Sequence, residues 1–231
     1  KALMPLNSQH TWVICAYGES QYLEACIQSL KNQTLTSKII CYTSTPLTSI
    51  YEICGKYDIP VHHKTGGGIG RDWNQALSFV TTKYATIAHQ DDYYEPKFLE
   101  KTLEAFEAHQ DGLITFTDYF EEKNGSKIDA NTNLKIKRLM LANLSIFPAS
   151  RFWRNRVLAF GNPICCPAVS YNLEKLRNFR FDEEMRVSLD WYAWYKISEY
   201  KGSFLYIPDA LMCHRIHQES ETTKTISDNT R

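Results

Sequence analysis

Two kinds of hydrophobic pattern alternate along the first half of this chain. Short apolar runs rich in strand-forming residues occupy residues 11–16, 37–43, 59–63 and 84–88. Each run is followed by a segment with apolar residues at helical spacing, at 22–31, 45–57, 71–80 and 96–110. Because strands and crossover helices alternate, we expect a parallel sheet with right-handed connections. The pattern therefore predicts an α/β fold.

The second half of the chain mixes these patterns less regularly. We expect a strand at 112–122, and Asn124-Gly125 predicts a hairpin into a strand at 126–129. Helices are expected at 134–144, 150–160, about 173–178 and, after a capping Ser188, 189–200; short strands are expected at 168–171, 203–207 and 211–216. The chain shows no internal repeat and no interdomain linker. We therefore expect one domain over residues 1–231, with halves at about 1–120 and 121–231.

Composition narrows the class of protein. A length of 231 residues with 43% apolar and 23% charged residues is typical of a globular domain with one substantial core. The 26 basic and 26 acidic residues balance, which argues against a nucleic-acid binder held by a general positive field. The seven cysteines are scattered, without a C-x-x-C pair, which favours reduced thiols. No apolar run approaches the length of a membrane span, and the first residues lack the apolar core of a signal peptide. We expect a cytoplasmic location, with the inner face of the membrane as an alternative.

Two adjacent carboxylates, Asp91 and Asp92, follow the strand predicted at 84–88. Open α/β sheets bind ligands at the carboxyl ends of their strands. Hard cations such as Mg²⁺ or Mn²⁺ bind to one or two carboxylates together with substrate phosphates. The alternative is a solvated turn whose aspartates cap the next helix. These residues alone leave both interpretations open.

Two further features have more than one interpretation. The glycine-rich loop at 65–70 could bring backbone amides close to a phosphate, or could be a flexible connector, and it has neither the P-loop lysine nor the G-x-G-x-x-G spacing. The basic residues of the helices expected at 134–144 and 150–160 form either a solvated face or a rim facing diphosphates or anionic lipid.

Four motifs in order resemble those of the family 2 glycosyltransferases, which are inverting enzymes with the GT-A fold. Asn74 and Asp92 match the asparagine of an R-N-x-G stretch and the last aspartate of D-x-D-D, separated by a helix and a strand. Leu189-Asp190, ahead of Trp191, is similar to the E-D motif. Residues 215–220 resemble the R-x-H-x-x-S stretch near the end of the domain.

The resemblance implies a three-layer α/β/α sandwich around a mostly parallel, mixed sheet, with the nucleotide-sugar half first and the acceptor half second. It implies a metal site at Asp91 and Asp92 for Mg²⁺ or Mn²⁺, Asp190 as the general base, and Trp191 on the acceptor side. The sugar of a nucleotide-sugar donor, a UDP-sugar in the first place, would be transferred to a saccharide or lipid-linked acceptor in bacterial surface-polysaccharide assembly. The expected donor-binding residues are Ala16, Tyr17, Ser44, Gly68, Asn74, His89, Asp91, Arg215 and His217.

The chain also departs from the family pattern. His89 stands at the first carboxylate position of D-x-D-D, and no acidic residue directly follows the second strand. Two alternatives therefore stay open. One is a nucleotidyltransferase, although a basic glycine-rich loop is missing after the first strand. The other is a non-catalytic nucleotide-sugar-binding relative. Peripheral association with a membrane is a further expectation.

Overall fold

The first half of the chain forms a parallel sheet of four strands. These are β1 (His10–Ala16), β2 (Lys38–Thr43), β3 (Val61–His63) and β4 (Tyr84–His89), which follow a short 3₁₀ turn at Leu6–Gln9. The spatial order is β3-β2-β1-β4, and every pair is parallel. β1 and β4 are buried almost throughout because helices cover both faces, which explains their continuous apolar sequences. The predicted strands and their parallel pairing are confirmed.

The second half completes one mixed sheet. Its strands are β5 (Tyr93–Tyr94), β6 (Gly112–Lys123), β7 (Ser126–Ile128), β8 (Val169–Asn172) and β9 (Ser203–Ile216). β8 follows the 3₁₀ turn Cys166–Ala168 and pairs antiparallel with both β4 and β6, so it joins the two halves. β6 pairs in parallel with β9, and β9 carries β5 at the edge. The computed structural model describes residues 5–216.

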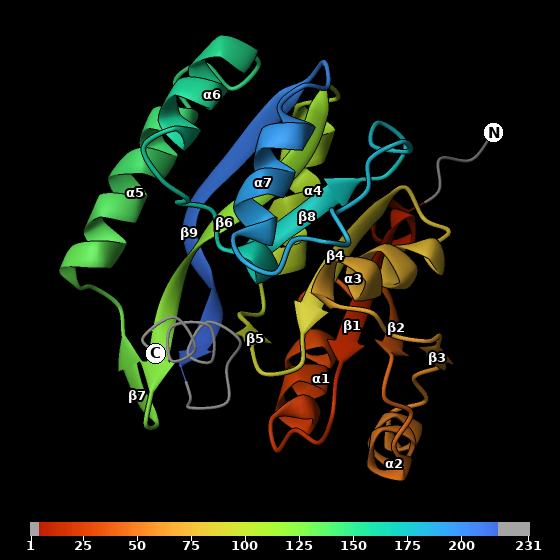
Figure 1. Ribbon diagram of the computed structural model, residues 1–231. Coiled ribbons are helices and arrows are strands. Elements are labelled where there is room, and N and C mark those ends of the chain that lie inside the picture. Colours follow the sequence, from red (N-terminus) through yellow and green to blue (C-terminus); the bar gives the residue numbers. More distant parts are fainter. Residues whose placement is uncertain (1–4, 217–231) are drawn as a thin grey trace.

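Helices cover both faces of the sheet, as Figure 1 shows. One face carries α1 (Leu23–Lys31), α2 (Thr48–Lys56) and α4 (Phe98–Ala108), which pack in one apolar core. The other carries α3 (Ile69–Ser78), α5 (Thr132–Leu144), α6 (Arg151–Leu158) and α7 (Leu189–Ile197), most of whose apolar residues form a second core. The predicted three-layer sandwich is confirmed. Within residues 5–216, none of the helices combines the length and apolar character needed to cross a bilayer.

Two expected elements are wrong. The strands predicted at 203–207 and 211–216 are one continuous strand, β9, because register shifts opposite Thr117 and Asp118 accommodate the exposed Pro208. The helix predicted at about 173–178 is a series of turns. There the side chain of Asn172 accepts a hydrogen bond from the backbone N of Lys175 at 3.3 Å, a local bond that competes with helix formation.

Turn and cap predictions had mixed outcomes. Asn124 and Gly125 adopt φ of 51° and 74° in the β6–β7 hairpin, as predicted. Ser188 lies before α7 as expected, but it adopts φ 57° and its side chain forms no capping hydrogen bond. The helix predicted at 45–57 begins later than expected, since α2 starts at Thr48.

Candidate active site

The carboxyl ends of β1 and β4 lie side by side, with Cys15 opposite His89, and their loops form one edge of the sheet. Gln90 joins these loops: its amide nitrogen donates to the Tyr17 carbonyl at 2.8 Å, and its oxygen accepts from the Tyr17 N–H at 3.2 Å. Ala16 is buried, whereas Tyr17 is 61% exposed at the edge. Strand order reverses between β1 and β4, and such a point is where α/β sheets bind ligands.

Asp92 is the most deeply buried carboxylate at this edge, with 2% of its surface exposed. Its Oδ1 accepts hydrogen bonds from Nδ1 of His214 at 3.2 Å and from the backbone N of Arg215 at 3.0 Å. Burial acts to raise the pKa of Asp92, but the nearby imidazoles and these hydrogen bonds outweigh it and bring the pKa below its ordinary value of 3.8. Asp92 is therefore a buried, ionised carboxylate.

The pKa values of the two histidines around Asp92 shift in opposite directions. Nδ1 of His89 lies 3.9 Å from Oδ2 of Asp92, and the His89 ring stacks on Trp73 at 5.5 Å between centroids. Burial lowers the pKa of His89, which favours the neutral ring. Burial also opposes the charge of His214, yet Asp92 outweighs it and raises the pKa of His214. Asp92 thus favours the charged form of His214. The buried Nε2 of His89 has no hydrogen-bond partner among residues 5–216.

Asp91 lies beside Asp92 and is held by a different set of contacts. Its Oδ1 accepts a hydrogen bond from the hydroxyl of Ser20 at 2.6 Å, and its backbone carbonyl accepts one from Arg215 at 3.1 Å. Ser20 belongs to the loop between β1 and α1. Asp91 therefore links this loop to the end of β9, and both predicted metal ligands lie at the same edge.

Arg215 is held by protein groups on several sides. Its Nε donates to Glu122 at 3.0 Å, and its guanidinium lies 4.7 Å from the ring centroids of both Tyr22 and Tyr93. The hydroxyl of Tyr93 also donates to Glu122, at 3.3 Å. Sequence analysis predicted Arg215 as a donor-binding residue, and the structure shows it fixing the position of the Asp91 backbone.

Asp190 lies in the first turn of α7. Its Oδ2 accepts a hydrogen bond from the side-chain amide of Asn162 at 2.8 Å, and its Oδ1 accepts one from the backbone N of Trp191 at 2.8 Å. The carboxylate of Asp190 lies near enough to His89 to favour its charged form. Asp190 therefore faces the same part of the molecule as the Asp92 cluster. The indole N–H of Trp191 donates to the Leu158 carbonyl at 2.9 Å and anchors α7 on α6.

Asn74 is engaged by backbone. Its amide donates to the Phe181 carbonyl at 2.9 Å and accepts from the Phe181 N–H at 2.8 Å, and it also donates to Glu183 at 3.0 Å. A Cβ at Gly70 would lie 2.1 Å from the Asp182 carbonyl oxygen, so the start of α3 touches the same segment. Asn74 thereby holds the segment around residue 182 against α3. Its predicted contact with the donor stays a prediction.

An acidic residue lies near the end of β2 in the structure, although no acidic residue directly follows this strand in the sequence. Asp72, from the first turn of α3, accepts hydrogen bonds from the hydroxyl groups of Ser44 at 2.9 Å and Tyr42 at 3.2 Å. Gly68 precedes α3 with φ 111°, a conformation that favours glycine. Asp72 was not among the residues predicted from the sequence, where its place two residues after the glycine-rich loop was the available signal.

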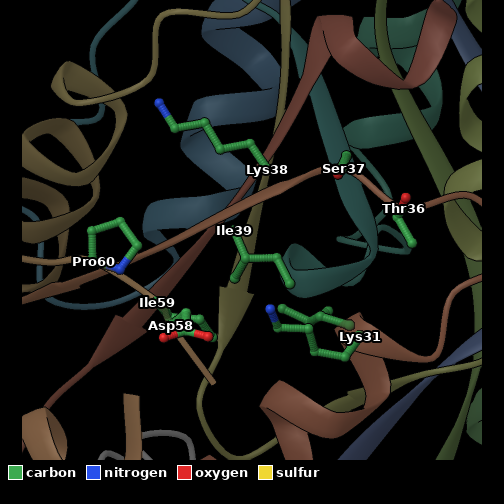
Figure 2. A pocket seen from close by; sticks show the side chains of 9 residues that line it. Lys31, Thr36, Ser37, Lys38, Ile39, Asp58, Ile59 and Pro60 are labelled. Carbon is green, nitrogen blue, oxygen red and sulfur yellow. The ribbon is translucent and has the colours of Figure 1, made fainter. Parts of the chain in front are cut away.

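One hollow of the molecule does not belong to this site. The hollow in Figure 2, about 400 Å³ and lined by residues such as Lys31, Lys38 and Asp58, lies at the amino end of β2, so it is at the opposite edge of the sheet. His217 lies outside the described residues.

Within residues 5–216, no group of three or more His, Cys, Asp and Glu is arranged to hold an ion. Mg²⁺ commonly takes only one or two carboxylates and completes its shell with water and substrate phosphates. Asp91 and the ionised Asp92 match that set, so these residues fit Mg²⁺ or Mn²⁺ held jointly with a diphosphate.

The fold and the paired aspartates at the β1–β4 edge define the class of α/β proteins with the GT-A fold. Among solved structures, the mannosyltransferase PcManGT of Pyrobaculum calidifontis matches with a TM-score of 0.71 at 12% identity, covering 95% of this chain and 60% of that one. S. aureus TarS 1–349 matches with a TM-score of 0.69 at 16% identity, covering 90% and 60%. The predicted GT-A architecture is confirmed.

The chain belongs to glycosyl transferase family 2, whose family model matches residues 11–176. It is 29% identical over 119 residues to a chondroitin synthase of Pasteurella multocida, and equally to a hyaluronan synthase of that species, which covers 46% of this chain but 12% of either relative. An uncharacterised glycosyltransferase of Haemophilus influenzae is 24% identical over 93% of this chain and 70% of its own. The resemblance drawn from the sequence motifs is thus confirmed, and the family membership favours a glycosyltransferase over the nucleotidyltransferase alternative.

Proposed function

We propose that this glycosyltransferase moves a sugar, with inversion, from a nucleoside diphosphate sugar to a saccharide or lipid-linked acceptor, assisted by Mg²⁺ or Mn²⁺. The observation that carries the proposal is the buried, ionised Asp92 beside Asp91 at the β1–β4 edge, with Asp190 acting on the same cluster. TarS is solved with UDP-GlcNAc and with UDP, and PcManGT with GDP-Man and Mn²⁺. These ligands support a nucleotide-sugar donor, with UDP-sugars as the first to test.

The chemistry would be a single displacement at the anomeric carbon. The acceptor hydroxyl oxygen forms the new bond, Asp190 takes its proton, and the bond to the diphosphate oxygen breaks with its electron pair on the departing nucleoside diphosphate. Asn162 orients the Asp190 carboxylate for this proton transfer. A divalent cation bound by Asp91 and Asp92 would act as a Lewis acid toward the leaving diphosphate.

The remaining assignments are part of the same proposal. Ala16, Tyr17 and Gly68 would approach the donor through backbone or ring, because they lie at or near the same edge of the sheet. Asp72 with Ser44 would face the nucleoside from the β2 side. Trp191 stays on the acceptor side. The P. multocida synthases support polysaccharide assembly as the setting. The seven cysteines are free thiols, and the cytoplasmic location predicted from them stays part of this proposal.

The test measures nucleotide release and sugar transfer from a panel of nucleotide sugars with Mn²⁺, for Asp92→Asn, Asp190→Asn and the unchanged chain. We expect Asp190→Asn to lower turnover by about 100-fold or more, because it removes the proton acceptor. We expect a similar loss for Asp92→Asn, since a cation's stabilisation of the leaving group amounts to several kcal/mol.

Asp58→Asn is the matched control, because Asp58 is an exposed aspartate at the opposite edge of the sheet and asparagine tolerates its φ of 54°. Its turnover should equal that of the unchanged chain. Full activity in both site variants would contradict the site assignment. Donor binding without any turnover on every sugar and acceptor would favour the non-catalytic relative.

A further inference from the structure

Exposed apolar side chains are concentrated on one part of this molecule. Half of the large hydrophobic residues exposed within residues 5–216 lie between 136 and 160, which includes most of α5 and all of α6. Phe152 is 73% exposed and Phe160 is 85% exposed. We name this surface the α5–α6 face, and its apolar residues are Ile136, Leu139, Ile146, Phe147, Phe152 and Phe160.

Three of these six residues lie on the helices, Ile136 and Leu139 on α5 and Phe152 on α6, and the other three lie in the segments that follow each helix. On α5, Ile136 and Leu139 are three residues apart with the exposed Lys135 beside them. On α6, Phe152 and Arg156 are four apart, and the guanidinium lies 5.9 Å from the Phe152 ring centroid. Each helix therefore exposes an apolar and a basic side chain close together.

The opposite sides of both helices are fixed to the rest of the molecule. The buried Arg154 donates to the carbonyls of Pro148 at 2.9 Å and Ser198 at 2.8 Å. Lys137 donates to the hydroxyl of Tyr119 at 2.8 Å, and Arg138 pairs with Asp118. The other sides of both helices are therefore already packed against the rest of the molecule, whereas Ile136, Leu139 and Phe152 remain exposed to solvent.

The charge of this region has one sign. Between Ala130 and Leu173 the sequence has no aspartate or glutamate, while α5 and α6 carry six lysines and arginines: Lys135, Lys137, Arg138, Arg151, Arg154 and Arg156. Among the exposed ones, Arg151 pairs with Glu199 of the neighbouring segment at 3.4 Å. Lys135 and Arg156 have no carboxylate within ion-pair distance among the described residues. The chain as a whole is neutral, so this face is locally positive.

The charge distinguishes between two occupants of the face. In a two-fold dimer the same patch would meet itself, so Lys135 and Arg156 would approach like charges with no acidic residue nearby in sequence to compensate. A membrane surface with anionic headgroups is complementary: basic residues meet the headgroups, and aromatic and aliphatic residues enter the acyl boundary.

We propose that the α5–α6 face docks this protein on a lipid surface that carries anionic headgroups. Docking at this face does not depend on the proposed catalytic roles, since none of its residues belongs to the Asp91–Asp92 site. α5 and α6 lie at the side of the molecule away from α2 and β3 (Figure 1). If the acceptor is lipid-linked, docking would bring the acceptor half close to it.

The experiment is cosedimentation of the full chain with vesicles of phosphatidylcholine alone or mixed with phosphatidylglycerol, at low and high salt. We expect binding to the mixed vesicles, weakened by salt. Neutralising the two basic residues in Lys135→Gln/Arg156→Gln should weaken it about tenfold or more, since each basic residue near such a surface contributes about 1 kcal/mol. Leu139→Ser/Phe152→Ser should weaken it about tenfold through lost apolar burial.

Leu47→Ser/Tyr51→Ser is the matched control, because both residues are exposed and lie at α2, on the other side of the molecule. It should bind as the unchanged chain does, and so should Asp92→Asn, which separates this test from that of the proposed function. Near-UV circular dichroism checks that each variant is folded. Failure of the unchanged chain to bind the mixed vesicles overturns the proposal. Light scattering that shows a dimer abolished by Leu139→Ser/Phe152→Ser also overturns it, in favour of a second copy.

Discussion

At the scale of single residues, Arg215 connects three parts of the site. It contacts Glu122 on β6 through Nε, the Asp91 carbonyl after β4, and the rings of Tyr22 and Tyr93. A planar guanidinium can make these contacts together, whereas a lysine offers one ammonium group and no flat face for stacking. Arg215 therefore acts on the site through its hold on the Asp91 loop.

We expect Arg215→Lys to lower kcat/KM about 10- to 100-fold, as loss of residues that orient metal ligands commonly does. In a double-mutant cycle with Glu122→Gln, the free energies of unfolding should show a coupling of about 1 kcal/mol, because the two side chains are partly buried and bonded. Urea denaturation and donor kinetics check this. Arg177→Lys, at an exposed arginine, is the control and should change neither. Independent effects of the two substitutions would contradict the contact.

The aspartates show which site residues sequence can reveal. Asp91, Asp92 and Asp190 were predicted because each follows a strand or begins a helix in a recognisable motif. Asp72 and Asn162 were missed because each reaches its partner from a remote part of the chain, 28 residues away in both cases. No local pattern encodes such a contact, since it depends on how the layers pack.

At the scale of elements, the strands and helices could be predicted from the spacing of apolar residues wherever the strand pairing is regular. The two strands predicted at 203–207 and 211–216 flank Pro208, and proline cannot donate to a sheet ladder. The strand continues nevertheless, since Ile207 pairs with Thr117 and Ala210 pairs with the next residue, Asp118. This bulge depends on the partner strand, and it could not be predicted from the segment alone.

Two glycines in helices make a matched test of close packing between elements. Gly70 in α3 faces the Asp182 carbonyl, where a Cβ would lie 2.1 Å from the oxygen, whereas a Cβ at Gly55 in α2 would meet nothing within 4 Å. We expect Gly70→Ala to lower the free energy of unfolding by about 3 kcal/mol because backbone must move. Gly55→Ala should raise it by about 0.5–1 kcal/mol through helix propensity. Urea denaturation checks both, and equal effects would contradict the close contact.

At the scale of the whole molecule, a network of buried side-chain hydrogen bonds crosses the middle of the sheet. His10 on β1 is fully buried, with Nε2 2.8 Å from the hydroxyl of Thr86 on β4 and Nδ1 2.9 Å from the hydroxyl of Ser37. The hydroxyl of Thr86 is also hydrogen-bonded to that of Ser170 on β8, so this network links the two halves of the sheet. A neutral imidazole suits this position because it donates through one nitrogen and accepts through the other.

Burial lowers the pKa of His10 from 6.5 to about 3, and this makes the stability of the whole fold depend on pH. Below pH 6.5 the unfolded chain binds a proton at His10 that the folded chain does not. The contribution of His10 to the free energy of unfolding is therefore fully present above that pH and decreases as the pH falls toward 3. Between about pH 7 and pH 5 the loss from His10 should be about 2 kcal/mol.

His10→Gln keeps a hydrogen-bond donor and an acceptor, and it should be less stable than the unchanged chain at neutral pH. Its free energy of unfolding should depend less steeply on pH, with a slope that is smaller by up to the contribution of one bound proton. Urea denaturation across this range measures both slopes, including the opposing contributions of His89 and His214 that the two proteins share. Equal slopes in the two proteins would show that His10 is not the group that responds.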